Sequence, residues 1–351
     1  MILIFDLSQI FSNDVTSKFR NPFLIACESN MWSIPRNIPT FSLNIWLNGI
    51  LILLPRKLRS SAGTTQRVAS CELTPIMKFS CLTWNTAKRV KYAYDQAKLI
   101  EEFNPDIVAL QEIILSSEKK FKKLLSKNYK HIVSSFELAP DLSLLTNKRM
   151  FGQIIASNFP LKPEDPNNFD VPWKERVLST KISINGSEIY FHTTHIPPGS
   201  QNGWIKIESL EGIYKRLIET KNKLNILCGD FNAPKEESLS KGMITFAQRI
   251  NAKGEVKIKS SFRGGDGARW DRGERNIIVK MKEHGIEDSF RSLYSYKTQE
   301  YSWRFRRKDK ILKRRFDHFF VTNKLKVISA KYLHNQKKIS DHSPLLVEYK
   351  L

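Results

Sequence analysis

Short apolar segments that each end beside a chemically reactive polar residue constrain the fold of this chain more than any other feature. Continuous apolar runs of this length are typical of strands buried in a sheet. Because the ends of neighbouring strands meet at one edge of a sheet, polar side chains placed there can converge on a common site. Six such segments occur, among them FSCLTW, IVALQ and NILCG. The polar residues at their ends are Asn85, Glu112, His195, Asp230, Asn232, Asp317, Asp341 and His342.

Each of these residues also has a purely structural explanation when it is taken alone. Asn85 can start a turn, Glu112 can begin a helix, and Asp230 can cap the turn that follows it. Six segments whose ends all carry acid–base or metal-binding residues together favour a site over six unrelated turns.

Helical and hairpin patterns separate the apolar segments. Residues 92–103 and 204–218 have apolar positions at helical spacing, and Asn104–Pro105 is expected to end the first helix. Alternating apolar residues on both sides of Asn185–Gly186 predict a hairpin with a tight turn. Hairpins combined with crossover helices indicate an α/β fold of layered sheets with antiparallel pairing.

The chain divides near Met77 into two segments of different character. Residues 1–76 show no clear amphipathic period and carry seven basic and four acidic residues, a net charge of only +3. Their longest apolar run, 41–54, is shorter than the ~20 residues that a membrane-spanning helix needs. We therefore expect 77–351 to be the folded domain and 1–76 to be a poorly ordered or wrongly assigned extension. Membrane contact through 41–54 is the alternative that this length disfavours.

The net charge of +22, from 57 Lys and Arg against 35 Asp and Glu, predicts a polyanionic partner, first nucleic acid and second an anionic membrane. A lysine-rich helix around Phe121 is equally explained as a solvated surface. The basic run 304–315 is expected to be a loop that rims the site and contacts phosphates. The Gly- and Arg-rich segment 260–275 predicts a flexible loop, in which Trp270 either stacks on a base or packs under the loop. The arginines expected to contact nucleic acid are Arg304, Arg306, Arg307, Arg314 and Arg315.

Several motifs resemble, in the same order, the signature of the endonuclease/exonuclease/phosphatase superfamily. They are LTWN (82–85), LQE (110–112), THIP (194–197), GDFN (229–232), FDHFF (316–320) and SDHSPL (340–345). The resemblance covers 79–349 and no part of 1–76. It implies a four-layer α/β/β/α sandwich of two packed mixed sheets, and hydrolysis of phosphoesters with Mg²⁺, or Mn²⁺, as the cofactor.

The resemblance also implies a role for each motif residue. Glu112 is a hard oxygen ligand suited to Mg²⁺, and Asp341 is expected to be a second, weaker ligand. Asp230 is expected to orient or deprotonate the attacking water. His342 is expected to contact the scissile phosphate, while Asp317 holds its ring. The side chains expected to donate to phosphate, or to protonate the leaving oxygen, are Asn85, Asn232 and His195.

Two positions depart from the family pattern. Ala87 stands where some relatives have a carboxylate, so the metal depends more on Glu112 and Asp341. His195 stands where apurinic endonucleases of the exonuclease III type usually have Tyr, which is closer to the deoxyribonuclease and phosphatase branches. Specificity for apurinic sites therefore does not follow from the resemblance.

These inferences together predict a Mg²⁺-dependent nuclease that acts on duplex DNA. A phosphoesterase for lipid or inositol phosphates is the alternative enzyme, because the same residues and charge support it. A catalytically silent nucleic-acid-binding module requires a lost catalytic residue, and the motifs lack none. The four cysteines have neither zinc-site nor disulfide spacing, so we expect a reducing, cytoplasmic location. We further expect a monomer with no obligate protein partner.

Overall fold

The computed structural model describes residues 44–47, 50–53, 77–139, 141–334 and 338–351. By its contacts the chain divides into two units, Met1–Thr74 and Pro75–Leu351. In the first unit, the described residues form two antiparallel strands, β1 (Asn44–Leu47) and β2 (Ile50–Leu53). The other sequence-based expectations for 1–76 lie outside the described residues. Among the helices that the structure describes, none is long and apolar enough to cross a membrane.

Two six-stranded mixed sheets form the centre of the second unit. In spatial order the first sheet contains β21 (Lys326–Tyr332), β22 (Leu345–Lys350), β3 (Lys78–Asn85), β4 (Ile107–Ile114), β6 (Phe151–Ser157) and β5 (His131–Ser134). The second contains β17 (Ile286–Asp288), β20 (Asp317–Thr322), β10 (Leu224–Asp230), β9 (Ser187–His195), β8 (Val177–Ile184) and β7 (Leu161–Pro163). Each sheet has one parallel pair, β3 with β4 and β9 with β10, and its other pairs are antiparallel.

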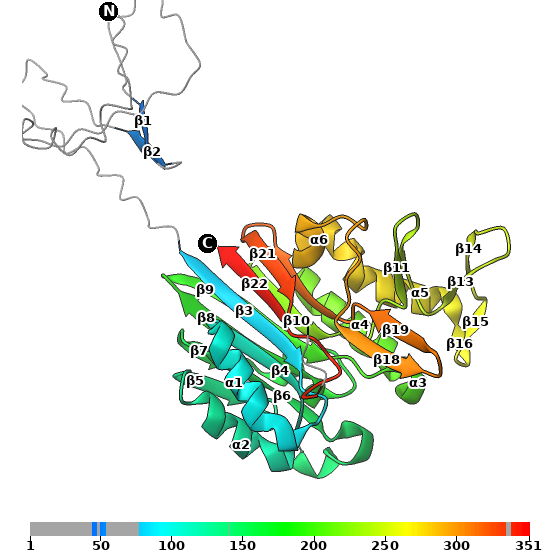
Figure 1. The fold of residues 1–351 in the computed structure, drawn as a ribbon, viewed down its shortest axis with the longest axis horizontal. Helices are drawn as coiled ribbons and strands as arrows, with labels where there is room; N and C mark the ends of the chain where they lie inside the picture. The colour runs from blue at the N-terminus through cyan, green and yellow to red at the C-terminus, as the bar shows by residue number, and fades with distance from the viewer. Residues whose placement is uncertain (1–43, 48–49, 54–76, 140, 335–337) are drawn as a thin grey trace, which may run out of the picture. The chain divides into compact units, whose positions relative to one another are not determined.

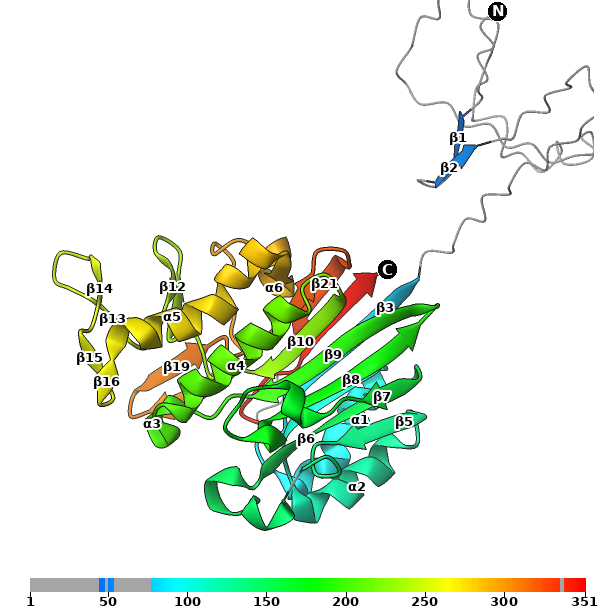
Figure 2. The ribbon, with the colours of Figure 1, turned by 180° about the vertical axis from the view of Figure 1, so that it is seen from behind.

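Helices cover the outer face of each sheet, α1 and α2 on one side and α4 and α5 on the other (Figures 1 and 2). One apolar cluster lies between the sheets and includes Cys81, Phe191 and Phe319. A second cluster lies beneath α4 and α5, and a third lies beneath α1 and α2. The expected four-layer α/β/β/α sandwich is thereby confirmed. The helices are α1 (Ala93–Phe103), α2 (Leu115–Leu125), α3 (Gly199–Asn202), α4 (Ile205–Glu219), α5 (Gly267–Ile278) and α6 (Ser289–Leu293).

Four two-stranded hairpins and several short 3-10 turns complete this unit. The hairpins are β11 (Glu236–Ser238) with β12 (Gly242–Ile244), β13 (Gln248–Ile250) with β14 (Val256–Ile258), β15 (Ser261–Phe262) with β16 (Gly265–Asp266), and β18 (Trp303–Arg307) with β19 (Lys310–Arg314). The 3-10 turns are η2 (Val90–Tyr92), η3 (Leu142–Leu144), η4 (Asn147–Arg149), η5 (Pro166–Asn168), η6 (Lys174–Arg176) and η7 (Lys280–His284).

Two expectations about loops are corrected by these elements. The segment 260–275 is not a flexible loop, because it forms β15, β16 and most of α5. Asp266 caps that helix by accepting hydrogen bonds from two of its first backbone N–H groups, of Ala268 and Arg269, which explains why a Gly-rich sequence becomes helical there. The basic run 304–315 is a regular hairpin and not an irregular loop.

The strand directions bring the functional motifs to one edge of the molecule. The parallel pairs β3–β4 and β9–β10 both end there, with Asn85, Glu112, His195 and Asp230 at or near their carboxyl ends. Strand β20 runs antiparallel to β10 and begins at the same edge, so Asp317 lies directly opposite Asp230 in register. The topology therefore gathers residues that are far apart in the sequence.

Candidate active site

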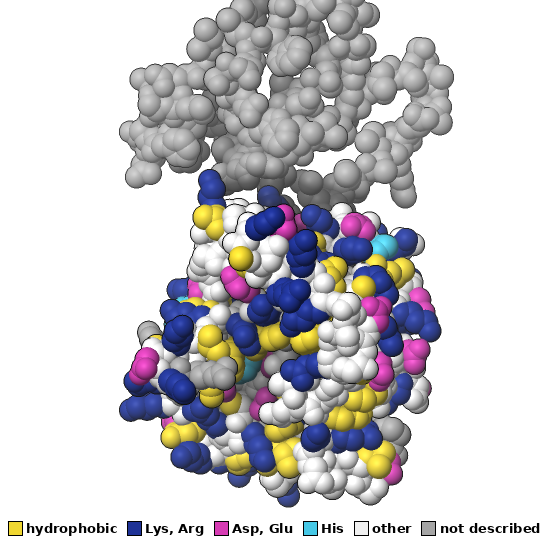
Figure 3. Space-filling model, turned by 90° about the vertical axis from the view of Figure 1, so that its right-hand side faces the viewer, with side chains coloured by type: hydrophobic (Ala, Val, Ile, Leu, Met, Phe, Trp, Pro, Cys, Tyr) yellow, Lys and Arg dark blue, Asp and Glu magenta, His cyan; other side chains and the backbone are white. Residues whose placement is uncertain are grey.

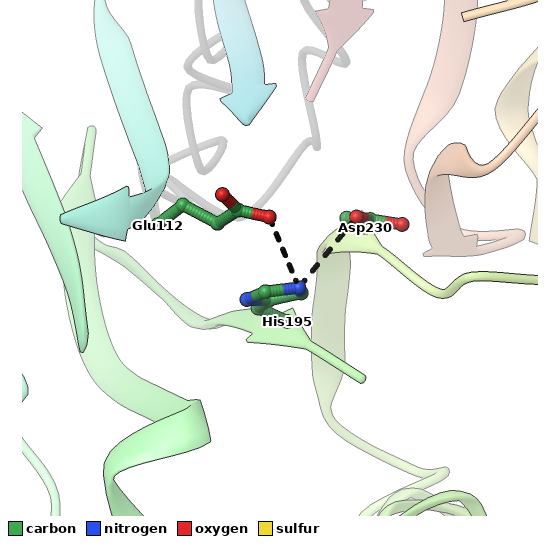
Figure 4. A group of neighbouring side chains, drawn as sticks. All are labelled: Glu112, His195 and Asp230. Atoms are coloured by element: carbon green, nitrogen blue, oxygen red, sulfur yellow. Dashed lines mark ion pairs between the residues drawn. The ribbon is translucent and has the colours of Figure 1, made fainter. Parts of the chain in front are cut away.

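Glu112 reaches the site through a local irregularity of β4. The register between β4 and β6 shifts between Leu110 and Ile113, and Glu112 adopts a φ of 56° at this bulge. A left-handed φ is unusual for a residue with a side chain, and bulges change the direction in which a side chain points. Glu112 is thus directed toward the strand ends of the other sheet (Figure 4).

Asn85 connects the two carboxylates of the site. Its Nδ2 donates to Oε1 of Glu112 (3.0 Å) and to Oδ2 of Asp230 (2.9 Å). Its Oδ1 accepts from the backbone N of Ala87 (2.8 Å), which fixes the orientation of the amide. An amide nitrogen has two hydrogens, and Asn85 donates one to each carboxylate, which holds both acids in place.

The GDFN segment forms a tight turn around Asp230. The backbone N–H of Asn232 donates to Oδ1 of Asp230 (2.8 Å), and Asn232 has a φ of 49°. Gly229 has a φ of 129°, and a Cβ there would lie 1.9 Å from the carbonyl oxygen of Thr194 on β9. Only glycine permits β10 to approach β9 this closely at its carboxyl end. The Asn232 side chain donates to the carbonyl of Ile196 (2.9 Å), which joins the turn to the segment after β9.

His342 and Asp317 form a buried pair beside Asp230. Nδ1 of His342 lies 2.7 Å from Oδ2 of Asp317, and Nε2 lies 3.8 Å from Oδ2 of Asp230. Burial disfavours the charged ring, but Asp317 and Asp230 raise the pKa of His342 to about 10. The imidazolium is therefore the form that faces Asp230 at neutral pH. Burial in turn raises the pKa of Asp230 to about 7, partly against the effect of His342.

His195 has a different protonation state, which follows from its burial and from its arginine neighbour. Nη1 of Arg176 contacts Nδ1 of His195, and an arginine can only donate, so Nδ1 must be the acceptor. Burial, with Arg176 next to it, holds the pKa of His195 well below its usual range. The neutral ring thus carries its hydrogen on Nε2, which lies 3.5 Å from Glu112 and 3.7 Å from Asp230 (Figure 4). The Nε2–H of His195 therefore faces both carboxylates.

The carboxylates provide a donor set that fits a hard divalent cation. Ligand atoms of Glu112, His195 and Asp230 lie within 4.8 Å of one another, as do those of Asp230, Asp317 and His342. Burial raises the pKa of Glu112 as well as that of Asp230, and an adjacent cation favours the ionised form of both. Because Nε2 of His195 carries a hydrogen, the oxygens of Glu112 and Asp230 are the better ligands, in keeping with Mg²⁺ chemistry.

Asp341 lies in the same pocket but in neither of these two ligand groups. Its Oδ2 accepts a hydrogen bond from Nε1 of Trp303 (3.1 Å). The structure therefore places Asp341 near Glu112 without bringing the two side chains into one ligand cluster. Its role as a second metal ligand stays a prediction.

A pocket of about 570 Å³ is lined by six of the site residues: Glu112, His195, Asp230, Asn232, Asp341 and His342. The hollowed face in Figure 3 carries many Lys and Arg side chains around His and acidic side chains. Arg176 and Lys206 are among the basic residues of this pocket that the sequence did not indicate. Lys206 is buried on α4, and its Nζ donates to the carbonyl of Asn232 (2.8 Å) and pairs with Glu274. Its position on the apolar stripe of α4, in line with Leu210 and Ile213, was a sequence signal for such a role.

The arginines predicted to contact nucleic acid differ in their exposure and position. Arg314 lines the pocket, Arg306 is exposed on the hairpin, and Arg304 is half-buried there. Arg307 ends β18. Arg315 is a correction, because its guanidinium is buried and pairs with Glu237 (2.7 Å) and Asp288 (2.8 Å).

Trp270 is a second correction. Its side chain is only 1% exposed and its ring packs edge-on against Trp204 and Phe262, with centroid distances of 5.3 and 4.9 Å. Nε1 of Trp270 donates to Glu274 (2.9 Å). Both faces of the ring are thus unavailable to a base, although Trp270 contributes to the pocket wall.

Comparisons with known proteins identify similar chains and folds. The model of the endonuclease/exonuclease/phosphatase family matches residues 82–342. An exodeoxyribonuclease III of Haemophilus influenzae is 23% identical over 267 residues, which are 72% of this chain and 92% of that protein. The structure of an AP endonuclease from Archaeoglobus fulgidus is 21% identical, with a TM-score of 0.53, and the match covers 77% of this chain and 98% of that one. The 3' phosphatase NExo from Neisseria, solved with a product DNA hairpin, is 18% identical, with a TM-score of 0.53 over 77% of this chain and 99% of that one.

Proposed function

Because the chain belongs to the endonuclease/exonuclease/phosphatase family, we propose that it is a metal-dependent phosphodiesterase that cleaves DNA. The observation that supports this most directly is the hydrogen-bonded group of Asn85, Glu112 and Asp230 next to the His342–Asp317 pair. Carboxylates that can hold a cation and an imidazolium that can face a phosphate are the two requirements of phosphodiester hydrolysis. The motifs meet both within one pocket.

The surroundings of the site favour a nucleic acid over a small phosphate. The chain has a net charge of +22, and six Lys or Arg side chains line the pocket. Phosphate contacts by Lys and Arg dominate the affinity of proteins for nucleic acids. In addition, the exodeoxyribonuclease, the AP endonuclease and the DNA-bound phosphatase named above are by their names and contents proteins that act on DNA.

Each side chain has a role in hydrolysis that follows from its position. Glu112, with Asp230 beside it, would hold the divalent cation, which would neutralise charge at the phosphate. Asp230 orients the attacking water, and the Asn85 amide keeps its carboxylate in place. The imidazolium of His342 stabilises the charge that develops on the phosphate, while Asp317 fixes the ring. His195 offers the hydrogen on Nε2 to a phosphate oxygen, because Arg176 occupies Nδ1.

A substrate panel tests this proposal. The purified full chain is incubated with Mg²⁺ or Mn²⁺ and supplied with plasmid DNA, linear duplex, abasic duplex, single-stranded DNA, RNA and inositol phosphates. We expect cleavage of DNA that stops on addition of EDTA and returns with excess Mg²⁺. Hydrolysis of inositol phosphates alone would favour the lipid or inositol phosphatase, and binding without any cleavage would favour a silent binding module.

A further inference from the structure

A buried ion pair joins α4 and α5 to the GDFN turn that follows β10. Lys206 lies on α4 and is only 1% exposed, and Glu274 lies on α5 and is fully buried. Nζ of Lys206 donates both to Oε1 of Glu274 and to the backbone carbonyl of Asn232 (2.8 Å). Lysine is rarely buried, because a charge that leaves water needs partners that replace its hydration. Here one of those partners is the backbone of the turn that carries Asp230.

Glu274 is itself held by donors from two other segments. Its Oε1 accepts a hydrogen bond from Nε1 of Trp270 on α5 (2.9 Å), and its Oε2 accepts one from the backbone N–H of Phe246, which lies between β12 and β13 (3.0 Å). The ammonium of Lys206 lies 4.6 Å from the ring centroid of Phe246, an arrangement that favours a cation. Because the partners of the pair come from several elements of the helical layer, the ammonium has little freedom to move.

Asn232 transmits this constraint to Asp230. Asn232 has a left-handed φ of 49°, its backbone N–H donates to Oδ1 of Asp230 (2.8 Å), and its Nδ2 lies 3.3 Å from Oδ2. The carbonyl that Lys206 holds belongs to this same residue. A left-handed backbone costs free energy, so partners on both its N–H and its carbonyl help to keep it there. The orientation of the Asp230 carboxylate therefore depends on the ammonium of Lys206.

We propose that Lys206, held by Glu274, is a positioning residue for Asp230: by donating to the carbonyl of Asn232 it fixes the turn, and with it the direction in which Asp230 meets the attacking water. This inference rests on the proposed function and adds a buried pair of the outer helical layer to the residues that turnover requires. Neither member of the pair needs to contact the substrate. A shift of about 1 Å at a catalytic group can lower the rate about 10²-fold.

Asp271 and Arg275 provide a matched control on the same helix. They form an ion pair on α5 (3.1 Å) in which Asp271 is buried, and Arg275 also donates to a backbone carbonyl, that of Met243 (3.3 Å). Met243 lies in β12, outside the GDFN turn. Loss of this second pair should therefore affect stability without affecting turnover.

The first test compares stability with turnover in the full chain. Lys206→Met leaves Glu274 as a buried charge without its cation and should lower the midpoint of urea denaturation. Lys206→Met/Glu274→Gln removes both charges, keeps an acceptor for Trp270 and should recover most of the midpoint. With Mg²⁺, at a temperature where circular dichroism shows every variant folded, turnover of DNA should fall about 10²-fold in both variants while KM stays the same. The control variant Arg275→Met/Asp271→Asn should keep wild-type turnover.

The second test asks whether Lys206 acts through Asp230. Residues that act as a unit give non-additive losses, whereas independent residues give losses that multiply. Addition of Lys206→Met/Glu274→Gln to Asp230→Asn should therefore lower the residual turnover very little. Its addition to Arg314→Gln, a change at the pocket wall, should retain the full loss.

The outcomes separate this inference from the proposed function. Wild-type turnover in the double variant would show that the pair serves stability alone, and a full additional loss in the Asp230→Asn background would show that Lys206 acts elsewhere. Either result overturns the positioning role while the proposed function stands. If wild-type protein with Mg²⁺ cleaves no phosphodiester at all, the proposed function itself fails and the positioning role fails with it.

Discussion

Asp230 is buried and Glu112 is half-buried, and the same amide holds both acids in different surroundings. Asp230 accepts a backbone N–H from Asn232 and lies near Nε2 of the charged His342. Glu112 is the less buried of the two and opens onto the pocket from the bulge of β4. The geometry thus assigns the water to the more constrained carboxylate and the cation chiefly to the more accessible one.

Substitution of each acid by its amide distinguishes these roles. We expect Asp230→Asn to lower turnover by about 10²- to 10⁴-fold while the variant still binds Mg²⁺, because the amide cannot accept a proton. Glu112→Gln should instead raise the Mg²⁺ concentration needed for activity. Turnover is measured across a Mg²⁺ titration, and metal binding is measured by calorimetry. If excess Mg²⁺ restores both variants equally, Asp230 is only a metal ligand.

Arg315 is a basic residue whose role is structural. Its guanidinium bridges Glu237 and Asp288, and Asp288 also contacts His318. All of these groups are buried, so the charges compensate one another within the protein. Removal of the cation leaves two buried carboxylates with fewer partners.

Arg315→Met is therefore expected to destabilise the fold by about 3–5 kcal/mol. Arg306→Met, at an exposed position of the neighbouring hairpin, is the control and should change the free energy of unfolding by less than about 0.5 kcal/mol. Both values come from urea denaturation at pH 7. A similar small effect for both variants would mean that Arg315 is not required by the buried cluster.

The same cluster predicts a dependence of stability on pH. Burial opposes ionisation, but Arg315 and Arg291 lower the pKa of Glu237 to about 2. Since the unfolded chain has a Glu pKa of about 4.3, ionised Glu237 stabilises the folded state above that pH. This contribution is lost as the pH falls from about 4.3 toward 2. The acid-induced loss of stability should be shallower in Glu237→Gln than in wild type when urea midpoints are compared across this range.

Sequence reasoning identified Arg315 and Trp270 as candidates for substrate contact, because the sequence gives the type of each residue but not the direction in which its side chain points. Trp303 faces the pocket two residues before exposed Phe305, whereas Arg315 follows the end of β19 and turns into the core. Burial of a charged residue depends on acids that are distant in sequence, such as Glu237. No local pattern contains this information.

At the scale of elements, the β18–β19 hairpin presents two different faces. Trp303 and Phe305 lie on one face, and Arg304 and Arg306 lie on the other, as strand alternation requires. The basic face is the part of the run 304–315 that remains suited to phosphate contacts. Arg314 adds a cation on the side of the pocket.

Neutralising this hairpin should reduce the salt dependence of DNA binding. Replacement of Arg304, Arg306, Arg307 and Arg314 by Gln removes up to four phosphate contacts, and each should lower the slope of log affinity against log salt by about one unit. Sequence preference should stay the same, and turnover at saturating substrate should fall less than affinity.

A variant of four lysines on α2 and just after it is the matched control for this experiment. Lys119, Lys120, Lys123 and Lys127 are exposed, and their replacement by Gln removes the same charge from another surface. An unchanged slope in the hairpin variant, or an equal change in both variants, would mean that the hairpin arginines are only solvated and do not contact the phosphates.

The β4 bulge is the element-scale feature that the sequence did not reveal. LQE continues an apolar strand, so the sequence predicted that Glu112 stands near a strand end but not that its φ is positive. A left-handed residue costs of order 1–2 kcal/mol, which the paired strands on either side must offset. The register shift lies in the pairing of β4 with β6, a strand distant in sequence, so no local pattern contains it.

At the scale of the whole molecule, the site depends on two sheets whose strand ends share one edge. Strand β3 supplies Asn85, β10 supplies Asp230, and the amide that joins them crosses from one sheet to the other. The order of the motifs was sufficient to predict the four layers, because the family resemblance contains the topology. The pairing of Asp317 with Asp230 across antiparallel strands required the structure.

The folded unit that carries this arrangement should be independent of 1–76. Met77 directly precedes β3 and packs against the core between the sheets, and its carbonyl accepts a hydrogen bond from the backbone N–H of Leu351. Among the described strands, β1 and β2 pair only with each other, so neither central sheet uses a strand from the first segment. Deletion of 1–76 therefore removes no described strand of the sandwich and only +3 of the total charge.

We expect protein that begins at Met77 to be soluble, to unfold within a few degrees of the full chain, and to cleave the same substrates at the same rate. Thermal denaturation by circular dichroism and the substrate panel provide the measurements. Protein that begins at Leu82 is the control. It also lacks Phe79 and Cys81 of the buried core and half of β3, and it should not fold. If protein that begins at Met77 aggregates or loses activity as the control does, residues 1–76 contribute to the core, and the domain boundary belongs further toward the N-terminus.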